Sequence, residues 1–129
     1  MTKTTENQNN ANNTFPISEN VQAICKALSE KMATDIKVVD INGMSDLADY
    51  FVICSAKSAA QVKAVFEHME EEMEKIGKFV IRKEGVSEGK WIAADYGDVI
   101  VHIFHKDLRG LYALENLWDK GNNILLYND

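Results

Sequence analysis

The sequence predicts an α/β fold in which a mixed five-stranded sheet is flanked by helices. At 129 residues the chain has the length of one domain. Five runs rich in β-branched and aromatic residues are interspersed with segments whose apolar residues recur at helical spacing. One of these runs, residues 50–56, is nearly all apolar, which is typical of a central strand buried on both faces. The resulting order, α-β-β-α-β-β-β-α, implies helices packed on a mixed sheet.

The first part of the chain is expected to be a disordered tail, residues 1–16, because this Asn- and Thr-rich segment cannot bury enough apolar surface to offset the entropy of ordering. The folded domain is expected to span residues 17–120. Ser18 is a plausible N-cap for a helix that runs to about Ala33. The apolar stripe of this helix consists of Val21, Ile24, Cys25, Leu28 and Met32.

The middle of the chain predicts a strand at 36–41, one short helical turn at 44–49 that Ser45 starts, and the buried strand at 50–56. The clearest helix follows, where Ser58 and Gln61 form a capping box. Its apolar stripe consists of Val62, Val65, Phe66, Met69, Met73 and Ile76, and Gly77 is its natural end. A third strand is expected at 79–85.

Residues 90–104 predict a hairpin, because two strand-like runs are separated by Gly97-Asp98, a pair suited to a tight turn. The predicted register places Tyr96 opposite Val99, Asp95 opposite Ile100, Ala93 opposite His102 and Trp91 opposite Phe104. One face then carries Ile92, Ala94, Tyr96, Val99, Val101 and Ile103, which suit a core. The other carries Trp91, Ala93, Asp95, Ile100, His102 and Phe104. This mixture of aromatic and ionisable groups suits a surface that meets a partner.

The last helix is expected to begin at Asp107, which can cap it, and to contain Leu108, Leu111, Tyr112, Leu114, Leu117 and Trp118. Residues 121–129 are expected to form a C-terminal tail, although the apolar stretch at 124–127 could pack against the domain.

Composition excludes several classes of function. The net charge of −6 argues against non-specific binding to a phosphate backbone and suits a basic protein surface, although moderate acidity is also common in soluble bacterial proteins. Cys25 and Cys54 have no CxxC partner or His-rich neighbourhood, so we expect buried free thiols, no metal site and no cofactor. No apolar run reaches the roughly 18 residues that span a membrane, and the N-terminus lacks a signal-peptide core, so a cytoplasmic protein is expected.

An active site can be sketched from Asp95, Asp98 and His102, but each residue has a simpler explanation. Asp98 lies at a turn, where Asp is favoured for local hydrogen bonding. His102 could act as a base near Asp95, yet no serine or cysteine is placed beside it as a nucleophile. The chain has neither GxxxxGK[ST] nor GxGxxG, and capping by Ser58 accounts for the turn that precedes its helix without any bound anion.

The chain resembles the ribosomal silencing factor family, also called the Iojap family, from about Val21 to Trp118. The resemblance is carried by ADYFVICSAKSAAQVKA, by Glu84-Gly85, by W-x-x-x-D-Y-G-D-V-I-V-H-I-F and by LYALENLW, in the order of the family. The block Asp-Tyr-Gly-Asp-Val-Ile-Val-His is rare in other contexts. The chain departs from the family in its SAKSAA turn, where a Gly/Thr/Ser version is common, and in its Asn-rich N-terminal extension.

The resemblance implies a nucleotidyltransferase-like fold without catalytic residues. It also implies a translational repressor that binds the large ribosomal subunit on its fourteenth protein, a basic partner, and blocks joining to the small subunit when nutrients are short. No direct readout of nucleic acid is expected. A second copy of the chain could cover the same surface when the ribosome is absent, as a homodimer. The alternative is a nucleotidyltransferase-like or other small-molecule enzyme that uses Asp95, Asp98 and His102.

The residues expected to contact the partner lie on the mixed face of the hairpin and on the last helix. Trp91 is expected to be the aromatic anchor, and Asp95 to bond Lys or Arg of the partner. The wider set consists of Trp91, Asp95, Tyr96, His102, Phe104, Arg109, Tyr112 and Glu115. Two arrangements remain open, because Trp91 could face the partner or could be covered by a helix of its own chain.

Overall fold

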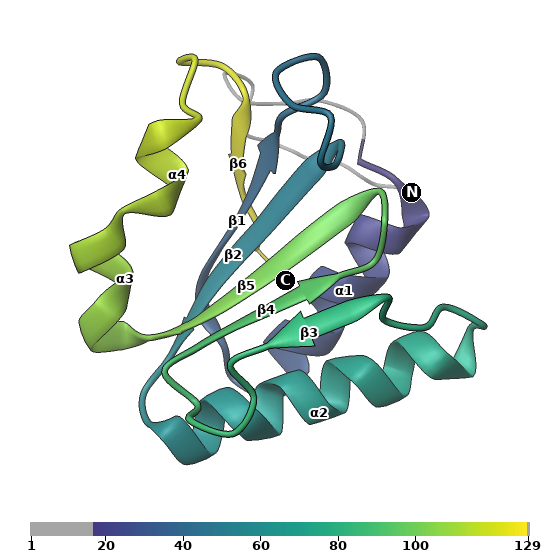
Figure 1. Cartoon of the computed structure of the whole chain (residues 1–129), viewed down its shortest axis with the longest axis vertical. Coiled ribbons are helices and arrows are strands. Elements are labelled where there is room, and N and C mark those ends of the chain that lie inside the picture. Colours follow the sequence, from purple (N-terminus) through teal and green to yellow (C-terminus); the bar gives the residue numbers. More distant parts are fainter. Residues whose placement is uncertain (1–16, 129) are drawn as a thin grey trace.

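The computed structural model describes residues 17–128, which form one mixed sheet with helices on both faces (Figure 1). The sheet has six strands in the order β3-β4-β5-β2-β1-β6, so the α/β class is confirmed and the predicted count of five is wrong. The extra strand is β6 (Ile124–Leu126), in the stretch for which a tail was expected. It pairs antiparallel with β1 (Thr34–Asp40). With only three residues it is too short for a periodic pattern in the sequence. The predicted tail at residues 1–16 lies outside the described residues.

The centre of the sheet is β2 (Tyr50–Ala56), which is parallel to β5 (Val99–His105) and antiparallel to β1. Six of the seven residues of β2 are buried, as expected for a strand with helices on both faces. Beyond β5 lie β4 (Trp91–Asp95) and the edge strand β3 (Arg82–Glu84), both antiparallel to their neighbours.

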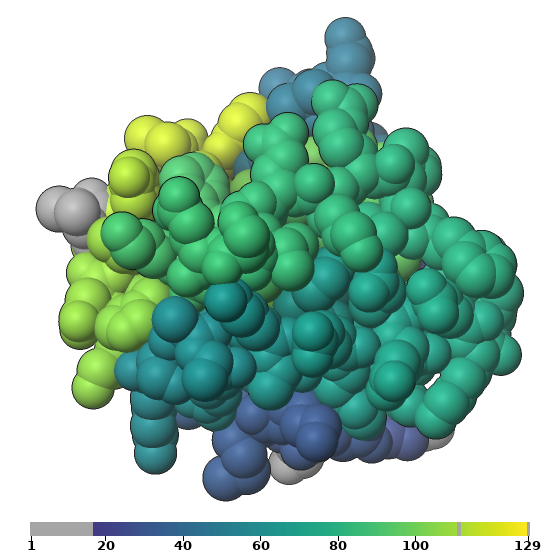
Figure 2. Space-filling view, turned by 60° about the horizontal axis from the view of Figure 1, so that its bottom comes forward, coloured from purple at the N-terminus to yellow at the C-terminus, as the bar shows by residue number. Residues whose placement is uncertain are grey.

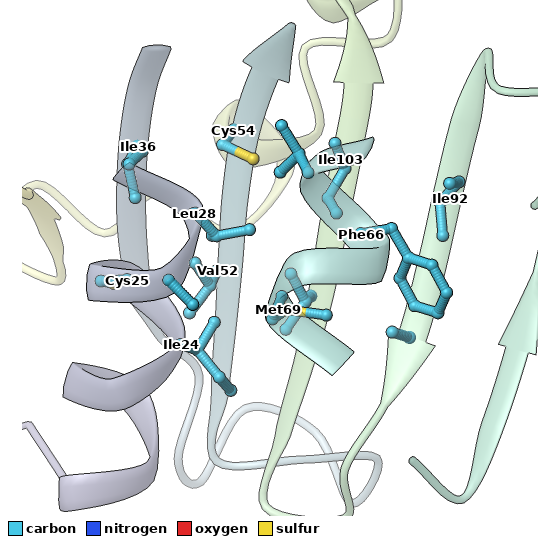
Figure 3. Close-up of a cluster of buried hydrophobic side chains, with 14 of the residues drawn as sticks. Ile24, Cys25, Leu28, Ile36, Val52, Cys54, Phe66, Met69, Ile92 and Ile103 are labelled. Atoms are coloured by element: carbon cyan, nitrogen blue, oxygen red, sulfur yellow. The ribbon is translucent and has the colours of Figure 1, made fainter. Parts of the chain in front are cut away.

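The larger core lies between the sheet and two helices, α1 (Glu19–Glu30) and α2 (Ala59–Lys75). Figure 3 shows Leu28 of α1 and Phe66 of α2 directed at the sheet. Both predicted caps are confirmed, because Ser18 Oγ accepts from Val21 N at 3.2 Å and Ser58 Oγ accepts from Gln61 N at 3.1 Å. The described helices contain none that is long and apolar enough to cross a membrane.

Three predicted elements differ from the observed ones. α1 ends three residues before Ala33, because Met32 adopts a left-handed backbone with φ 68°. Residues 44–49 form turns rather than a helical turn, and Ser45 Oγ accepts from Leu47 N at 3.0 Å within them. The strand expected at 79–85 is reduced to β3, because the chain bends at residue 81.

The expected last helix is two short helices, α3 (Lys106–Tyr112) and α4 (Leu114–Leu117), which pack on the opposite face from α1 and α2 (Figure 1). The break is at Ala113, whose φ of 46° is left-handed. The N-cap of α3 is His105 rather than Asp107, and the His105 ring nitrogen Nδ1 accepts from Asp107 N at 3.1 Å. Because the chain breaks at Ala113, Tyr112 is the last residue of α3.

Candidate partner-binding face

The β4–β5 hairpin has the predicted register and the predicted separation of its two faces. Trp91 pairs with Phe104, and Tyr96 N donates to Val99 O at 2.9 Å next to the Gly97-Asp98 turn. The predicted core residues pack with α1 and α2: Ile92, Ala94, Tyr96, Val99, Val101 and Ile103. Trp91, Ile100 and Phe104 belong instead to a second apolar group that lies beneath α3 and α4.

Aromatic rings form a continuous group on this second face. Trp91 stacks on Phe104 with 4.8 Å between ring centroids, and Tyr112 of α3 lies 4.9 Å from Trp91. Phe51 of β2 contacts the ring of His102 edge-on at 5.1 Å. The aromatic cluster, as we call it, consists of Phe51, Trp91, His102, Phe104, Tyr112 and Trp118. Such contacts fix ring orientations more tightly than aliphatic packing does.

Exposure decreases from Tyr112 through Trp91 to Phe104. Tyr112 is 50% exposed, Trp91 is half-buried, and Phe104 is fully buried. Trp91 therefore combines the two arrangements that the sequence left open, because α3 packs against part of its ring and the remainder is open to solvent. A large ring that is held in place yet partly exposed suits an interface anchor.

The Trp91 indole donates from Nε1 to Nδ1 of His102 at 3.0 Å. Since Nδ1 accepts, the imidazole is neutral and carries its proton on Nε2, which is buried and has no hydrogen-bond partner among the described residues. Burial lowers the pKa of His102 to about 4. The nitrogen that a general base would use is thus already occupied by Trp91.

Asp95 and Tyr96 end the β4 strand on opposite faces. Asp95 Oδ1 accepts from Gly97 N at 2.8 Å, so one carboxylate oxygen holds the hairpin turn. The Tyr96 ring points inward as predicted, and its hydroxyl is buried without a partner among the described residues. Burial, with a smaller contribution from Glu70 and Glu74, raises the pKa of Tyr96 to about 12. Asp95 is accessible to a partner, whereas the Tyr96 hydroxyl is enclosed.

Arg109 and Glu115, two residues expected at the rim of the contact, are 6% and 8% exposed and bond each other. Arg109 Nε donates to Glu115 Oε2 at 3.2 Å, and its Nη1 donates to Ser55 Oγ at 2.8 Å. Its Nη2 donates to the main-chain oxygen of Asp35 at 2.9 Å. Lys37 Nζ lies 3.5 Å from Glu115 Oε2. Burial alone would raise the pKa of Glu115. Hydrogen bonds and the charges of Arg109 and Lys37 have a larger opposite effect, so the pKa is lowered overall. The network ties α3 and α4 to the end of β2.

Two charged residues that sequence reasoning missed lie beside this face. In the register of β3 with β4, Arg82 is opposite Asp95 and Glu84 is opposite Ala93, so both side chains lie on the Trp91 side of the sheet. Both are exposed. β3 and β4 are consecutive strands joined by residues 85–90, but this connection is longer than a two-residue hairpin turn, so the sequence alone does not fix their register.

The three residues of the enzyme alternative are not assembled into a common site. Asp98 accepts from Asn20 Nδ2 at 3.4 Å, and its main-chain oxygen accepts from Asp49 N at 2.9 Å, so it joins the hairpin turn to neighbouring segments. His102 is enclosed in the aromatic cluster on a different part of β5. Within residues 17–128, no three His, Cys, Asp or Glu side chains are grouped so that they could hold a metal ion.

Comparison with known proteins places this architecture in a family. The family "Ribosomal silencing factor during starvation" matches residues 14–128. A ribosomal silencing factor of Bacillus subtilis is 44% identical over 92 residues, which cover 71% of this chain and 78% of that protein. The chloroplastic protein Iojap of Zea mays is 34% identical over 81% of this chain and 45% of its own length. A crystal structure of a Bacillus halodurans protein superposes with a TM-score of 0.74 at 33% identity, covering 84% of this chain and 98% of that one.

The family match extends over both layers of helices and all six strands. It includes the hairpin that carries Trp91 and the two short helices that pack beside it. Sequence, fold and relatives therefore agree, and the chain belongs to the ribosomal silencing factor family.

Proposed function

We propose that this protein is a non-enzymatic, cytoplasmic repressor of translation. It binds the large ribosomal subunit on its fourteenth protein and sterically blocks joining to the small subunit under nutrient limitation. The observation that carries the proposal is Trp91, a large ring that its own chain holds firmly yet leaves partly exposed on an acidic protein. The names of the relatives, ribosomal silencing factors, support the same role.

The anchor is prepared for binding before the partner arrives. Trp91 is stacked on Phe104 and bonded to His102, so its side chain loses little conformational freedom when the interface forms. Trp residues that become buried when an interface forms commonly dominate its binding free energy. His102 and Phe104 are buried beneath Trp91. They contribute to binding by holding its ring in place, and they contact the partner little themselves.

Charge on the open side of the anchor fits a basic partner. One oxygen of Asp95 holds the turn, and the other is available for a charge-assisted bond to Lys or Arg. Glu84 adds a second exposed carboxylate on the same side of the sheet. Complementary charge of this kind raises the rate of encounter and fixes the orientation of the partner.

The buried pair of Arg109 and Glu115 acts indirectly in this proposal. Both side chains are enclosed, so they serve by holding α3 where Tyr112 packs beside Trp91. Tyr96 supports the hairpin from the core side. When the subunit is absent, the same exposed face is available to a second copy of the chain. The proposal also treats the fold as a nucleotidyltransferase-like one that lacks catalytic groups.

Co-sedimentation with purified large subunits tests the proposal. Trp91→Ala should lose most of its binding and should no longer prevent formation of joined ribosomes in a sucrose gradient. Met32→Ala is the matched control, because Met32 is 72% exposed just after α1, a helix that packs on the opposite face of the sheet from Trp91, and its truncation should change nothing. Retention of full affinity by a folded Trp91→Ala protein would refute the assignment of the anchor.

Calorimetric titration with magnesium and nucleoside triphosphates separates the repressor from the enzyme alternative. The repressor should show no heat of binding. A saturable signal that Asp98→Asn or His102→Gln abolishes would instead establish a small-molecule site.

A further inference from the structure

The segment between α2 and β3 is an exposed ridge with an unusual composition. Three of its side chains are large, apolar and more than half exposed: Ile76 at 54%, Phe79 at 65% and Ile81 at 66%. They occur within six residues, at the end of the sheet where the segment projects from the domain (Figure 1). Figure 2 shows the same segment, coloured teal to green, at the right margin of the molecule. Apolar groups gathered this closely on a surface commonly mark a binding site.

The ridge is also a local concentration of positive charge on an acidic chain. Residues 75–83 contain no Asp or Glu, although the whole chain has a net charge of −6. Their four cations are Lys75, Lys78, Arg82 and Lys83. Lys75 is engaged by Glu72 at 2.7 Å and Lys83 by Glu70 at 2.9 Å, and these pairs neutralise two of the glutamates of α2.

Lys78 and Arg82 are exposed and make no ion pair with any of the residues that the structure describes. They flank Phe79 in sequence. Exposed cations close in sequence to an exposed aromatic ring can contact a phosphate backbone while the ring stacks on a base. Two exposed glutamates in the last turns of α2, Glu71 and Glu74, limit the contact to a few phosphates.

The ridge continues the proposed binding face. Arg82 lies opposite Asp95 on the same side of the sheet as Trp91, and the Ile81 side chain reaches to within 3.4 Å of the position that a Cβ atom would take at Gly97. If the large ribosomal subunit docks on Trp91, as proposed above, its surface lies next to the side of the sheet that leads to the ridge. The large subunit offers negative charge mainly as RNA phosphate, since its proteins are predominantly basic.

We propose that the ridge formed by Ile76, Lys78, Phe79, Ile81 and Arg82 contacts exposed, unpaired RNA of the large subunit, through phosphate and base stacking. This inference rests on the proposed function and adds a second contact to it. The contact is local and reads no sequence, so it is compatible with the acidic character of the whole chain.

Photochemical cross-linking tests the contact directly. With Phe79 replaced by p-benzoylphenylalanine, irradiation on the large subunit should give a cross-link that ribonuclease removes. The same group at Met32 should give no RNA cross-link. A cross-link from position 79 to protein alone, or none in a sample that co-sediments with the subunit, would overturn the proposal.

Binding of the isolated protein to a fluorescein-labelled 12-nucleotide uridine oligomer is the independent measurement. Wild type should bind weakly, and its affinity should fall as salt rises. Lys78→Glu with Arg82→Glu should lose at least tenfold in affinity, and Phe79→Ala about tenfold. Lys31→Glu with Lys120→Glu makes the same change in net charge at exposed sites elsewhere and should lose less than threefold.

Three results contradict the RNA contact: no binding by wild type, equal losses in both double variants, or equal competition by a polyglutamate peptide of the same length. The last would indicate an acidic protein as the occupant. Trp91→Ala should still bind the oligomer while losing the subunit. The RNA contact of the ridge and the binding of the subunit through Trp91 are thus tested separately, and either proposal can fail while the other holds.

Discussion

Trp91 and His102 are joined by a hydrogen bond from the indole Nε1 to the imidazole Nδ1, 3.0 Å long, across the β4–β5 pair. The bond connects a half-exposed ring to a buried one. The position of the Trp91 anchor therefore depends on His102, a residue that lies beneath the surface. Trp91→Phe should keep the stack on Phe104 and lose this bond. We expect a loss of about 1 kcal/mol in the free energy of unfolding, measured by urea denaturation.

Comparison of Trp91→Phe with Trp91→Ala separates the contribution of the ring to subunit binding from that of its hydrogen bond to His102. Trp91→Phe should retain part of the affinity for the large subunit, whereas Trp91→Ala should retain little. Equally large losses in the two variants would mean that the bond from the indole nitrogen to His102, rather than the area of the ring, determines the affinity.

Stability should depend on pH through His102. Burial lowers the pKa of His102 to about 4 in the folded protein, against 6.5 when exposed. Below pH 6.5 the unfolded chain binds the proton more readily, so this contribution is complete above pH 6.5 and is lost as pH falls to 4. The loss is about 3 kcal/mol. His102→Gln can still accept from Trp91 and should remove this dependence, as measured by urea unfolding at pH 7, 5.5 and 4.5. A parallel pH profile in wild type and variant would contradict the assignment.

The buried ion pair of Arg109 with Glu115 should be costly to break. Arg109→Met leaves the Glu115 carboxylate enclosed with Lys37 as its remaining cation, and we expect a loss of about 3 kcal/mol in the free energy of unfolding. The double variant that also carries Glu115→Met should recover part of this loss, because no uncompensated charge remains. Thermal unfolding of the four proteins in the cycle gives the coupling energy. Strict additivity would show that the two side chains do not act as a pair.

Two glycines with almost the same positive φ allow the effect of backbone strain to be separated from that of close contact. Gly85 has φ 82° and Gly43 has φ 83°. A Cβ at Gly85 would lie 2.0 Å from the main-chain oxygen of Trp91, whereas one at Gly43 would meet nothing within 4 Å. Gly43→Ala should cost about 1 kcal/mol from the left-handed backbone alone. Gly85→Ala should cost several-fold more and should displace Trp91, visible as a shift in its fluorescence.

Ala113 is a position where a glycine should help. Its φ of 46° at the break between α3 and α4 is unfavourable for a residue with a Cβ. Ala113→Gly should raise the free energy of unfolding by about 0.5 kcal/mol, after allowance for the greater freedom of the unfolded chain. Ala64→Gly, at an exposed position inside α2, should instead lower it by about 1 kcal/mol. The same sign for both substitutions would exclude relief of strain at Ala113.

The hairpin shows how far sequence reasoning reaches. Its register and both of its faces follow from Gly97-Asp98 and from alternation along the strands, which are local signals. The contacts made by α3 and α4 cannot be predicted from such local signals. Arg109 and Glu115 look like surface residues of a helix, and only the break at Ala113 brings them together over Ser55. A break without glycine or proline leaves no mark in the sequence.

Two further elements depend on tertiary pairing alone. β6 forms because Asn123 is held by the main-chain oxygens of Asp40 and Trp118, at 3.0 and 2.8 Å, and directs the chain along β1. The segment before β3 reads as a strand from Phe79 onward, yet the main-chain bond that it makes to β4 is from Ile81 N to Asp95 O, at 2.8 Å. Phe79 and Ile81 remain exposed, while Val80 packs against the larger core. Short strands with distant partners carry too few residues for a local prediction.

The edge strand β3 also has a consequence for the behaviour of the protein in concentrated solution. It is three residues long, all of them charged, and its middle residue, Lys83, reaches back over the ring of Phe66 to Glu70. A short charged border gives another chain little to pair with, so this edge of the sheet resists lengthening by addition of foreign strands. The exposed aromatic face is therefore not accompanied by an open strand edge on the β3 side of the sheet.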